Sequence, residues 1–127
     1  MLHNLSSMVS VMSELDPLYY QFIKDQQADN FFFCFRWFLT FFKREFSHMN
    51  TVIYLWEVLW SHHDKDYQYY FALAMLESVR ADIMALSSFD EILKKINDFS
   101  DKFDAENVLA LSQGIYAFKH QVLMNCE

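Results

Sequence analysis

The sequence predicts an all-α fold, a compact bundle of about seven helices around a central aromatic helix. Apolar residues make up 54% of its 127 residues and aromatic residues make up 19%, which is enough to build a substantial core. A single glycine and a single proline leave almost no turn punctuation. The alternation of apolar and polar residues that is typical of strands does not occur, so helices joined by short polar links are expected.

Two amphipathic helices are expected at the start of the chain. Apolar residues recur at helical spacing over about residues 4–14, which predicts the first helix. Asp16 and Pro17 then form the pattern of an N-cap followed by proline at the first helical position. They predict a second helix that runs through Gln26.

The most apolar stretch of the sequence predicts the central helix, over about residues 30–46. Between Phe31 and Phe42 only Arg36 and Thr40 are polar, a pattern that is typical of a buried helix. This run is shorter than the roughly 20 residues needed to cross a bilayer, so no transmembrane segment is expected. Neighbouring helices are therefore expected to cover it on most sides.

The polar residues of this predicted helix fall into two groups. Arg36, Thr40 and Lys43 lie on one narrow stripe at helical spacing, with Arg44 beside them. Glu45 falls instead in the apolar arc, where a carboxylate is costly unless it is paired or close to the helix end. We therefore expect a narrow cationic edge on an otherwise buried helix.

Four further helices complete the predicted bundle. Ser88 and Glu91 have the spacing of a capping box, which opens the third of these helices. Gly114, inside the last helix, costs about 1 kcal/mol relative to alanine, so we expect it to mark a close helix contact. The expected bounds of the four helices are about 51–61, 66–86, 89–99 and 104–123.

Charge and composition argue against several classes of function. The formal net charge of −7 argues against nucleic-acid binding, for which a basic patch is the expected footprint. His62, His63 and Asp64 suggest metal ligands, but adjacent histidines point about 100° apart on a helix, so no metal site is predicted. No cofactor is predicted, and the N-terminus lacks the basic and apolar regions of a signal peptide.

Three short motifs stand in order along the chain. They are Phe35-Arg36-Trp37, then Phe42-Lys43-Arg44-Glu45-Phe46, then Leu55-Trp56-Glu57-Val58-Leu59-Trp60. Together they resemble the second half of a TBC-type Rab GTPase-activating domain, in which R-W on an aromatic helix is followed by R-E-F and by L-W-D or L-W-E. The similarity extends more weakly from about Leu5 to about Val122, so it covers nearly the whole chain.

The resemblance implies that residues 1–127 form the C-terminal lobe of such a domain, without its catalytic N-terminal lobe. In that family an arginine from an I-x-x-D-x-x-R motif and a glutamine from a Y-x-Q motif accelerate GTP hydrolysis on a Rab protein. The first motif does not occur in this sequence. Gln21 matches the second, but Phe22 follows it where the family has glycine, and it lies too close to Arg36. We therefore expect no catalytic residue in this chain and no acceleration by the chain alone.

The motif residues are expected to be mainly structural. The resemblance also allows Arg36, Lys43 and Arg44 to contact a partner. For the two arginines the reason is that a guanidinium suits bidentate recognition of phosphate. Motif residues on a mostly buried helix usually fix its packing, which favours the structural role for the arginines. The motif residues are Arg36, Trp37, Arg44, Glu45, Phe46, Leu55, Trp56 and Glu57.

The resemblance implies two partners, a Rab-family small GTPase in its GTP form and the N-terminal lobe of the same domain. It also implies a cytoplasmic role in vesicle-mediated and intracellular protein transport, peripheral on endomembranes through the full-length protein or its partners. Apolar surface left by a missing lobe predicts self-association of the isolated chain. Two alternatives stay open: a non-catalytic helical adaptor that binds a small GTPase or another helical protein, and a truncated product with no independent role.

Overall fold

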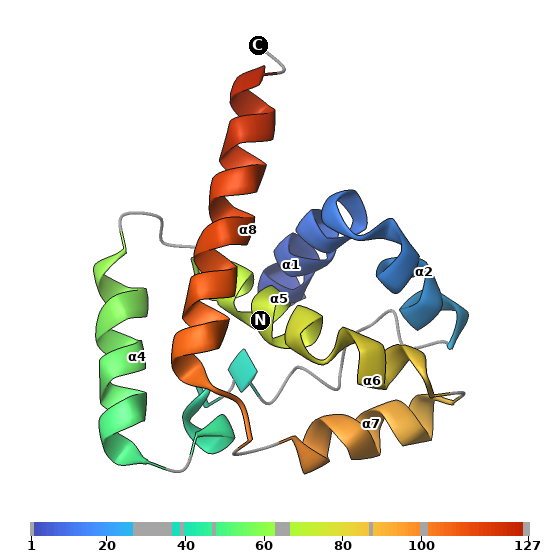
Figure 1. Ribbon diagram of the computed structural model, residues 1–127, viewed down its shortest axis with the longest axis horizontal. Helices are drawn as coiled ribbons and strands as arrows, with labels where there is room; N and C mark the ends of the chain where they lie inside the picture. Colours follow the sequence, from blue (N-terminus) through green and yellow to red (C-terminus); the bar gives the residue numbers. More distant parts are fainter. Residues whose placement is uncertain are drawn as a thin grey trace.

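The computed structural model is built from helices throughout the part of the chain that it describes, which confirms the all-α prediction (Figure 1). Seven α-helices and one short 3₁₀-helix lie within this part. It covers residues 2–26, 37–38, 40–46, 48–62, 67–86, 88–99 and 102–125. The helices are α1 (Leu2–Leu15), α2 (Pro17–Asp25), the 3₁₀-helix η2 (Lys43–Glu45), α4 (Met49–Ser61), α5 (Tyr67–Ser78), α6 (Arg80–Met84), α7 (Phe89–Asp98) and α8 (Ala105–Asn125).

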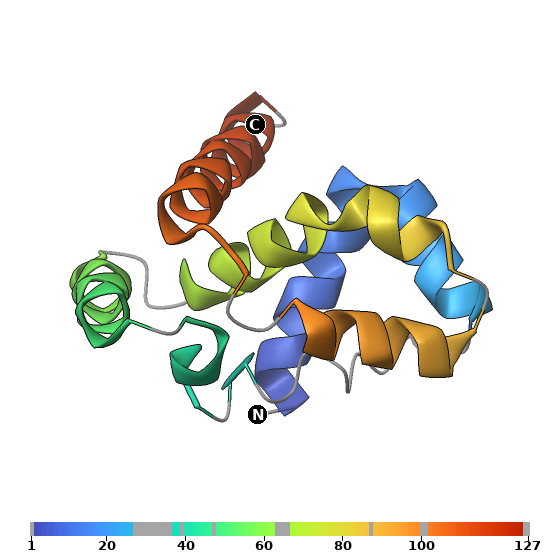
Figure 2. The same cartoon turned by 60° about the horizontal axis from the view of Figure 1, so that its bottom comes forward.

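Helix α5 is the central element among the helices that the structure describes (Figure 1, Figure 2). Eight of its 12 residues are buried, and six of these are consecutive, so they face every direction around the helix axis. Helix α8 packs along α5 most extensively, and α1 packs along it next. Aromatic side chains from the second sequence motif cover it further, with the rings of Phe42 and Phe71 5.0 Å apart. A helix that is apolar all round is stable only when it is covered in this way.

Capping side chains confirm three of the predicted helix starts. Asp16 accepts a hydrogen bond from the backbone N–H of Tyr19 at 3.2 Å, at the start of α2. Ser88 accepts one from the backbone N–H of Glu91 at 3.3 Å, at the start of α7. Asp104 accepts two from N–H groups in the first turn of α8, at 3.1 and 3.3 Å. Each cap satisfies a backbone donor that has no partner within its own helix.

The central helix predicted over residues 30–46 is wrong in its C-terminal part. Trp37 and Phe38 are helical, but the chain then turns, and the residues of η2 form a separate 3₁₀-helix. The polar stripe expected from helical spacing therefore does not continue to Lys43. The expected N-terminal part of this helix falls on residues 27–36, which lie outside the described ranges.

A left-handed turn ends the helix that contains Trp37. Phe41 and Phe42 have φ values of 49° and 68°, in a region that residues other than glycine rarely adopt. The Phe42 N–H donates to the Trp37 carbonyl at 2.7 Å, and the Phe41 N–H donates to the Phe38 carbonyl at 3.3 Å. These are the two hydrogen bonds of a Schellman cap, in which glycine is the usual left-handed residue. With phenylalanine in that place, no residue in the sequence marks the turn.

The long helix predicted over residues 66–86 is also interrupted. Helix α5 ends at Ser78 and α6 begins at Arg80, with Val79 between them in a turn of φ −113° and ψ 15°. The turn buries the Val79 side chain and brings α6 into contact with α2. Packing of the core therefore overrides the continuous helical pattern of the sequence.

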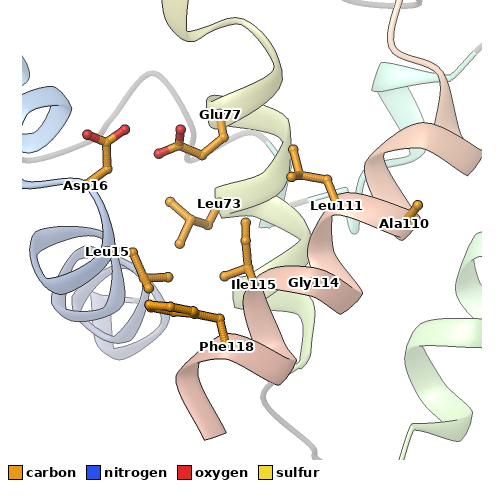
Figure 3. Close-up of a pocket in the computed structure, with 9 residues that line it drawn as sticks. All are labelled: Leu15, Asp16, Leu73, Glu77, Ala110, Leu111, Gly114, Ile115 and Phe118. Atoms are coloured by element: carbon orange, nitrogen blue, oxygen red, sulfur yellow. The ribbon is translucent and has the colours of Figure 1, made fainter. Parts of the chain in front are cut away.

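Gly114 lies near the middle of α8, and the close helix contact expected at this residue is wrong. A β-carbon built on Gly114 would meet no atom within 4 Å. Gly114 instead lines a groove between α8, α5 and the corner where α1 meets α2 (Figure 3). The absence of a side chain at this position leaves that groove open.

We expect Gly114→Ala to stabilise the fold by up to about 1 kcal/mol, because alanine favours the helix and its methyl group meets open space. Urea denaturation followed by circular dichroism measures the change in the free energy of unfolding. Ala110→Gly, in the same helix and groove, is the matched control and should lose a similar amount. A destabilised Gly114→Ala variant would contradict the open space described for this residue.

Candidate functional site

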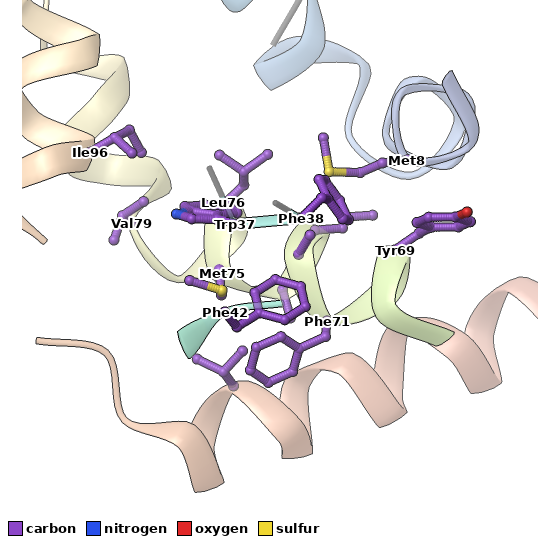
Figure 4. Close-up of a cluster of buried hydrophobic side chains, with 14 of the residues drawn as sticks. Met8, Trp37, Phe38, Phe42, Tyr69, Phe71, Met75, Leu76, Val79 and Ile96 are labelled. Atoms are coloured by element: carbon purple, nitrogen blue, oxygen red, sulfur yellow. The ribbon is translucent and has the colours of Figure 1, made fainter. Parts of the chain in front are cut away.

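Trp37, from the first motif, is enclosed completely by the core. Its side chain has no exposed surface and belongs to the buried cluster that also contains Leu76 and Val79 (Figure 4). Its ring meets the ring of Phe103 edge to face, with 6.0 Å between centroids and 85° between planes. Its indole N–H donates no hydrogen bond to any described residue. Trp37 therefore connects the core to the segment between α7 and α8, which contains Phe103.

The second motif turns its aromatic residues and one carboxylate inward. The Phe42 ring meets the Phe71 ring at 5.0 Å and 73°, and the Phe46 ring lies 6.2 Å from the same Phe71 ring. Glu45, the last residue of η2, is fully buried. This agrees with its expected place among apolar residues, although the α-helix assumed in that expectation does not extend to this position.

The two cations of the second motif, in contrast, lie at the surface. Lys43 and Arg44 are both exposed on η2. Arg36, the third cation expected at a partner contact, lies outside the described residues. The short 3₁₀-helix therefore places two cations at the surface directly before a buried carboxylate.

The third motif attaches α4 to the left-handed turn. The indole N–H of Trp56 donates to the carbonyl of Phe41 at 2.7 Å. The Trp60 ring stacks on the Phe41 ring at 5.4 Å and 13°, yet Trp60 keeps 61% of its surface exposed. Leu55 is buried and Glu57 is exposed. One tryptophan of the motif thus anchors α4, and the other lies at the surface.

A partly exposed apolar stripe, formed by Met49, Ile53, Trp56 and Trp60, runs along one side of α4, where Trp56 and Trp60 also contact Phe41. Met49, Ile53 and Trp60 are 53%, 45% and 61% exposed. The four residues follow the spacing i, i+4, i+7 and i+11, which places them on one side of the helix as in a helix-packing seam. Contiguous apolar surface of this kind is typical of binding sites for other proteins.

A pair of carboxyl groups lies at one end of the groove beside Gly114. Asp16 accepts a hydrogen bond from Arg80 Nε at 2.7 Å, and Glu77 of α5 lies next to Asp16 (Figure 3). Burial raises the pKa of Glu77 to about 7, and the hydrogen bond with Asp16 adds to this effect. Burial alone would raise the pKa of Asp16, but hydrogen bonds, first that from Arg80, lower it below its usual value.

Of the three residues Asp16, Glu77 and Arg80, the sequence alone singles out only Asp16. Asp16 is recognisable as a cap because Pro17 follows it. Its partner Arg80 stands 64 residues away, and no local pattern connects the two. Glu77 also carries no sequence signal, since a carboxylate on a helix is usually at the surface.

Gln21, which matches the Y-x-Q pattern, lies on the exposed face of α2. Its side-chain amide donates to Asp25 Oδ1 at 2.9 Å. The tyrosine that begins the pattern, Tyr19, is buried and donates its hydroxyl to the carbonyl of Leu76 at 3.1 Å. The matching residues therefore attach α2 to α5 through Tyr19.

His62 packs against aromatic rings at the end of α4. Its ring centroid lies 4.0 Å from that of Tyr67 and 5.0 Å from that of Tyr116. Its neighbours His63 and Asp64 fall outside the described ranges. Within those ranges no three histidine, cysteine, aspartate or glutamate side chains gather as metal ligands. None of the helices described is long and apolar enough to cross a bilayer.

Comparison with known protein families decides where these motifs belong. The family model of the Rab-GTPase-TBC domain matches residues 3–84, more than half of the chain. The chain belongs to the Rab-GTPase-TBC domain family. The part of this TBC chain that matches extends from α1 through α6 and includes all three motifs.

Curated relatives of this TBC chain match it over most of its length. TBC1 domain family member 17 of Homo sapiens is 34% identical over 118 residues, which are 91% of this chain and 18% of the relative. GTPase-activating protein GYP7 of Saccharomyces cerevisiae is 30% identical over 112 residues, 87% of this chain and 15% of the relative. Small G protein signaling modulator 2 of Mus musculus is 31% identical over 126 residues, 95% of this chain and 12% of the relative. The TBC chain thus spans less than a fifth of the length of these relatives.

We expect the tryptophans of the TBC motifs to differ sharply in their contribution to stability. Trp37→Ala should cost about 3 to 5 kcal/mol of the free energy of unfolding, because the ring is fully buried. Trp60→Ala should cost less than about 1 kcal/mol, because 61% of this residue is exposed. Chemical denaturation of both variants measures the two losses, and equal losses would contradict the burial of Trp37 relative to Trp60.

We expect Glu77→Gln to change the pH dependence of stability. Burial beside Asp16 raises the pKa of Glu77 from 4.5 to about 7, so the folded state favours the neutral carboxyl group. This stabilisation is fully present below the unfolded pKa of 4.5 and is lost as the pH rises to about 7. The free energy of unfolding of the variant should equal that of the wild type at about pH 5 and exceed it by about 1 kcal/mol at about pH 8. The gain is modest because Glu77 is only half-buried, so solvent screens its charge.

Urea unfolding of the wild type and the Glu77→Gln variant at both pH values measures this difference. Glu57→Gln, which removes a charge from an exposed carboxylate on α4, is the control for the change in net charge. If Glu77→Gln shifted stability by the same amount at both pH values, the neutral carboxyl group in the folded state would be ruled out.

Proposed function

We propose that this chain is the C-terminal lobe of a TBC domain in a GTPase-activating protein for Rab-family small GTPases. The observation that carries the proposal is the family match over residues 3–84, which contains all three motifs. The names of two relatives agree with it, since one is a GTPase-activating protein and the other a small G protein signaling modulator. Because the chain spans a small part of such relatives, its own contribution would be that of one lobe within a larger protein.

Most motif residues would act by fixing the shape of this lobe. Trp37 supports that role because it is fully buried between several helices. Trp56 supports it because its indole N–H binds the carbonyl of Phe41 and so holds α4 to the turn. Phe46 and Leu55 fill the core around these contacts. A rigid lobe of this kind could brace a catalytic lobe and present a defined surface to a GTPase.

Lys43 and Arg44 are the proposed contacts to a Rab-family GTPase in its GTP form. Both side chains are exposed on η2, and the turn before η2 stacks Phe41 on the exposed ring of Trp60. Ammonium and guanidinium groups complement phosphates and acidic side chains, and an adjacent aromatic surface adds contact area. Arg36 joins this proposal through its place in the first motif.

The chain alone is proposed not to accelerate GTP hydrolysis. The I-x-x-D-x-x-R pattern that supplies the family's arginine does not occur in the sequence. Gln21, the match to the Y-x-Q pattern, is bound to Asp25 on α2. Since an arginine finger is worth about 10³ to 10⁵ in rate, a lobe that lacks it would contribute little by itself. The catalytic groups would come from an N-terminal lobe, and the apolar stripe of α4 is a surface that such a lobe could cover.

The proposed setting follows from the proposed partner. A regulator of Rab proteins would act in the cytoplasm in vesicle-mediated and intracellular protein transport. It would reach endomembranes as a peripheral protein, through the full-length protein or its partners.

A second candidate function is a non-catalytic helical adaptor. The apolar stripe on α4 favours it, because an exposed seam at helical spacing is suited to binding another helix. An adaptor would bind a GTPase or another helical protein without any change in the rate of hydrolysis.

We expect the chain to bind a GTP-loaded Rab protein without increasing its single-turnover hydrolysis by as much as about tenfold. Binding should weaken by about tenfold in the Lys43→Ala/Arg44→Ala double variant, since two exposed cations are removed. The Lys94→Ala/Lys102→Ala double variant removes two other exposed cations and should bind normally. Fluorescence titration with a panel of Rab proteins measures affinity.

A rate increase of about tenfold or more by the chain alone would contradict the assignment of catalysis to another lobe. Binding that depends on Trp60 but not on Lys43 and Arg44 would favour the adaptor. Sedimentation of the same samples reports self-association through the α4 stripe, which Trp60→Lys should remove. A wild-type chain that remains monomeric at about 50 μM would exclude strong self-association through that stripe.

A further inference from the structure

The groove beside Gly114, named the α5 groove below, has a volume of about 430 Å³ and mainly apolar walls. Leu73 contributes to its floor from α5, Leu15 lies on the α1 side, and Ile115 and Phe118 lie on the α8 side (Figure 3). Helices α1 and α8 both pack on α5, and the ion pair of Glu14 with Lys119 joins them to each other. The volume lies within the range of sites that bind ligands or inserted side chains.

One end of the α5 groove is short of positive charge. Asp16 and Glu77 are two carboxyl groups, and among the described residues Arg80, which hydrogen-bonds Asp16 at 2.7 Å, is the one cation that acts on both. Glu77 hydrogen-bonds the other carboxyl group and is half-buried. With both carboxylates ionised the cluster has a net negative charge, which an added cation would neutralise.

We propose that the α5 groove binds a basic amphipathic helix of a protein partner, which inserts apolar side chains between α1 and α8 and places a lysine or arginine against Glu77. The apolar walls and the acidic end together select this chemistry, because each matches one face of such a helix. A helix lying across the mouth of the groove, with only its side chains inserted, would add to the layer that covers α5. This proposal does not depend on the Rab-related function.

The protonation of Glu77 gives this binding a definite pH dependence. With a pKa of about 7, Glu77 is mostly neutral in mildly acidic solution and mostly ionised in mildly alkaline solution. Only the ionised form attracts a cation, so affinity should rise as the pH increases through about 7. The charged groups that act on Glu77 are Asp16 and Arg80. The Arg80 guanidinium also lies over the Tyr19 ring of α2, and Glu14 of α1 and Lys119 of α8 neutralise each other in an ion pair.

Two synthetic peptides can test the proposal on the complete chain. The first is an alanine-based helix of about 15 residues with leucines along one face and one lysine beside them, and the second has norleucine in place of that lysine. Binding is followed through the NMR methyl signals of Leu15, Leu73 and Ile115, which line the groove. The lysine peptide should bind about fivefold more tightly at about pH 8 than at about pH 5.5, and the norleucine peptide should bind equally at both.

Three variants separate the contributions of charge and space. Glu77→Gln should remove the pH dependence while the peptide still binds. Gly114→Phe should fill the groove and weaken both peptides by about tenfold, whereas Gly114→Ala, the matched control, should change affinity little. Circular dichroism establishes that each variant is folded. The proposal is overturned by any of three results: no binding of the lysine peptide at about 1 mM, full binding by Gly114→Phe, or equal affinity of the lysine peptide at both pH values.

Discussion

The burial of helix α5 on most of its faces is the constraint on which the rest of the structure depends. A helix with apolar side chains on all faces is stable only when other elements cover each face. Helices α1 and α8 supply two of these covers, and the aromatic turn after Trp37 supplies another. The bend at Val79 then allows α6 to leave the axis of α5 and to meet α2. The positions of the TBC motifs follow from this arrangement, because their apolar residues belong to the cover of α5.

The left-handed turn at Phe41 and Phe42, which helps to cover α5, has an unfavourable backbone energy. Two consecutive left-handed phenylalanines, Phe41 and Phe42, are expected to cost on the order of 1–2 kcal/mol each in backbone energy. Burial of the Phe42 ring against Phe71 contributes about 2 to 3 kcal/mol and offsets most of this cost. Phe41 gains a stacked contact with Trp60, and its carbonyl accepts the Trp56 hydrogen bond. The same turn directs the cations of η2 outward and its carboxylate inward.

The sequence predicts structural features, such as helix caps, that depend only on a residue and its near neighbours in the chain. Asp16 and Ser88 are recognisable as caps because their side chains bond to backbone groups within the next few residues. The turn at Phe41 and the bend at Val79 carry no such signal, since burial against distant helices selects them. In the candidate site, resemblance identifies the motif residues but not which of them are exposed. Glu77 is unpredictable for a related reason, as its carboxyl partner comes from another part of the chain.

The contact between the α1–α2 corner and the α5–α6 corner has a consequence for synthesis on the ribosome. Tyr19 reaches Leu76 over 57 residues, and Asp16 reaches Arg80 over 64. At about 5 to 20 residues per second, the ribosome needs about 3 to 13 seconds to produce the second corner after the first. During that interval the apolar faces of the first two helices have no α5 to cover them, so the nascent chain is open to chaperones and to misassociation until translation has passed Arg80.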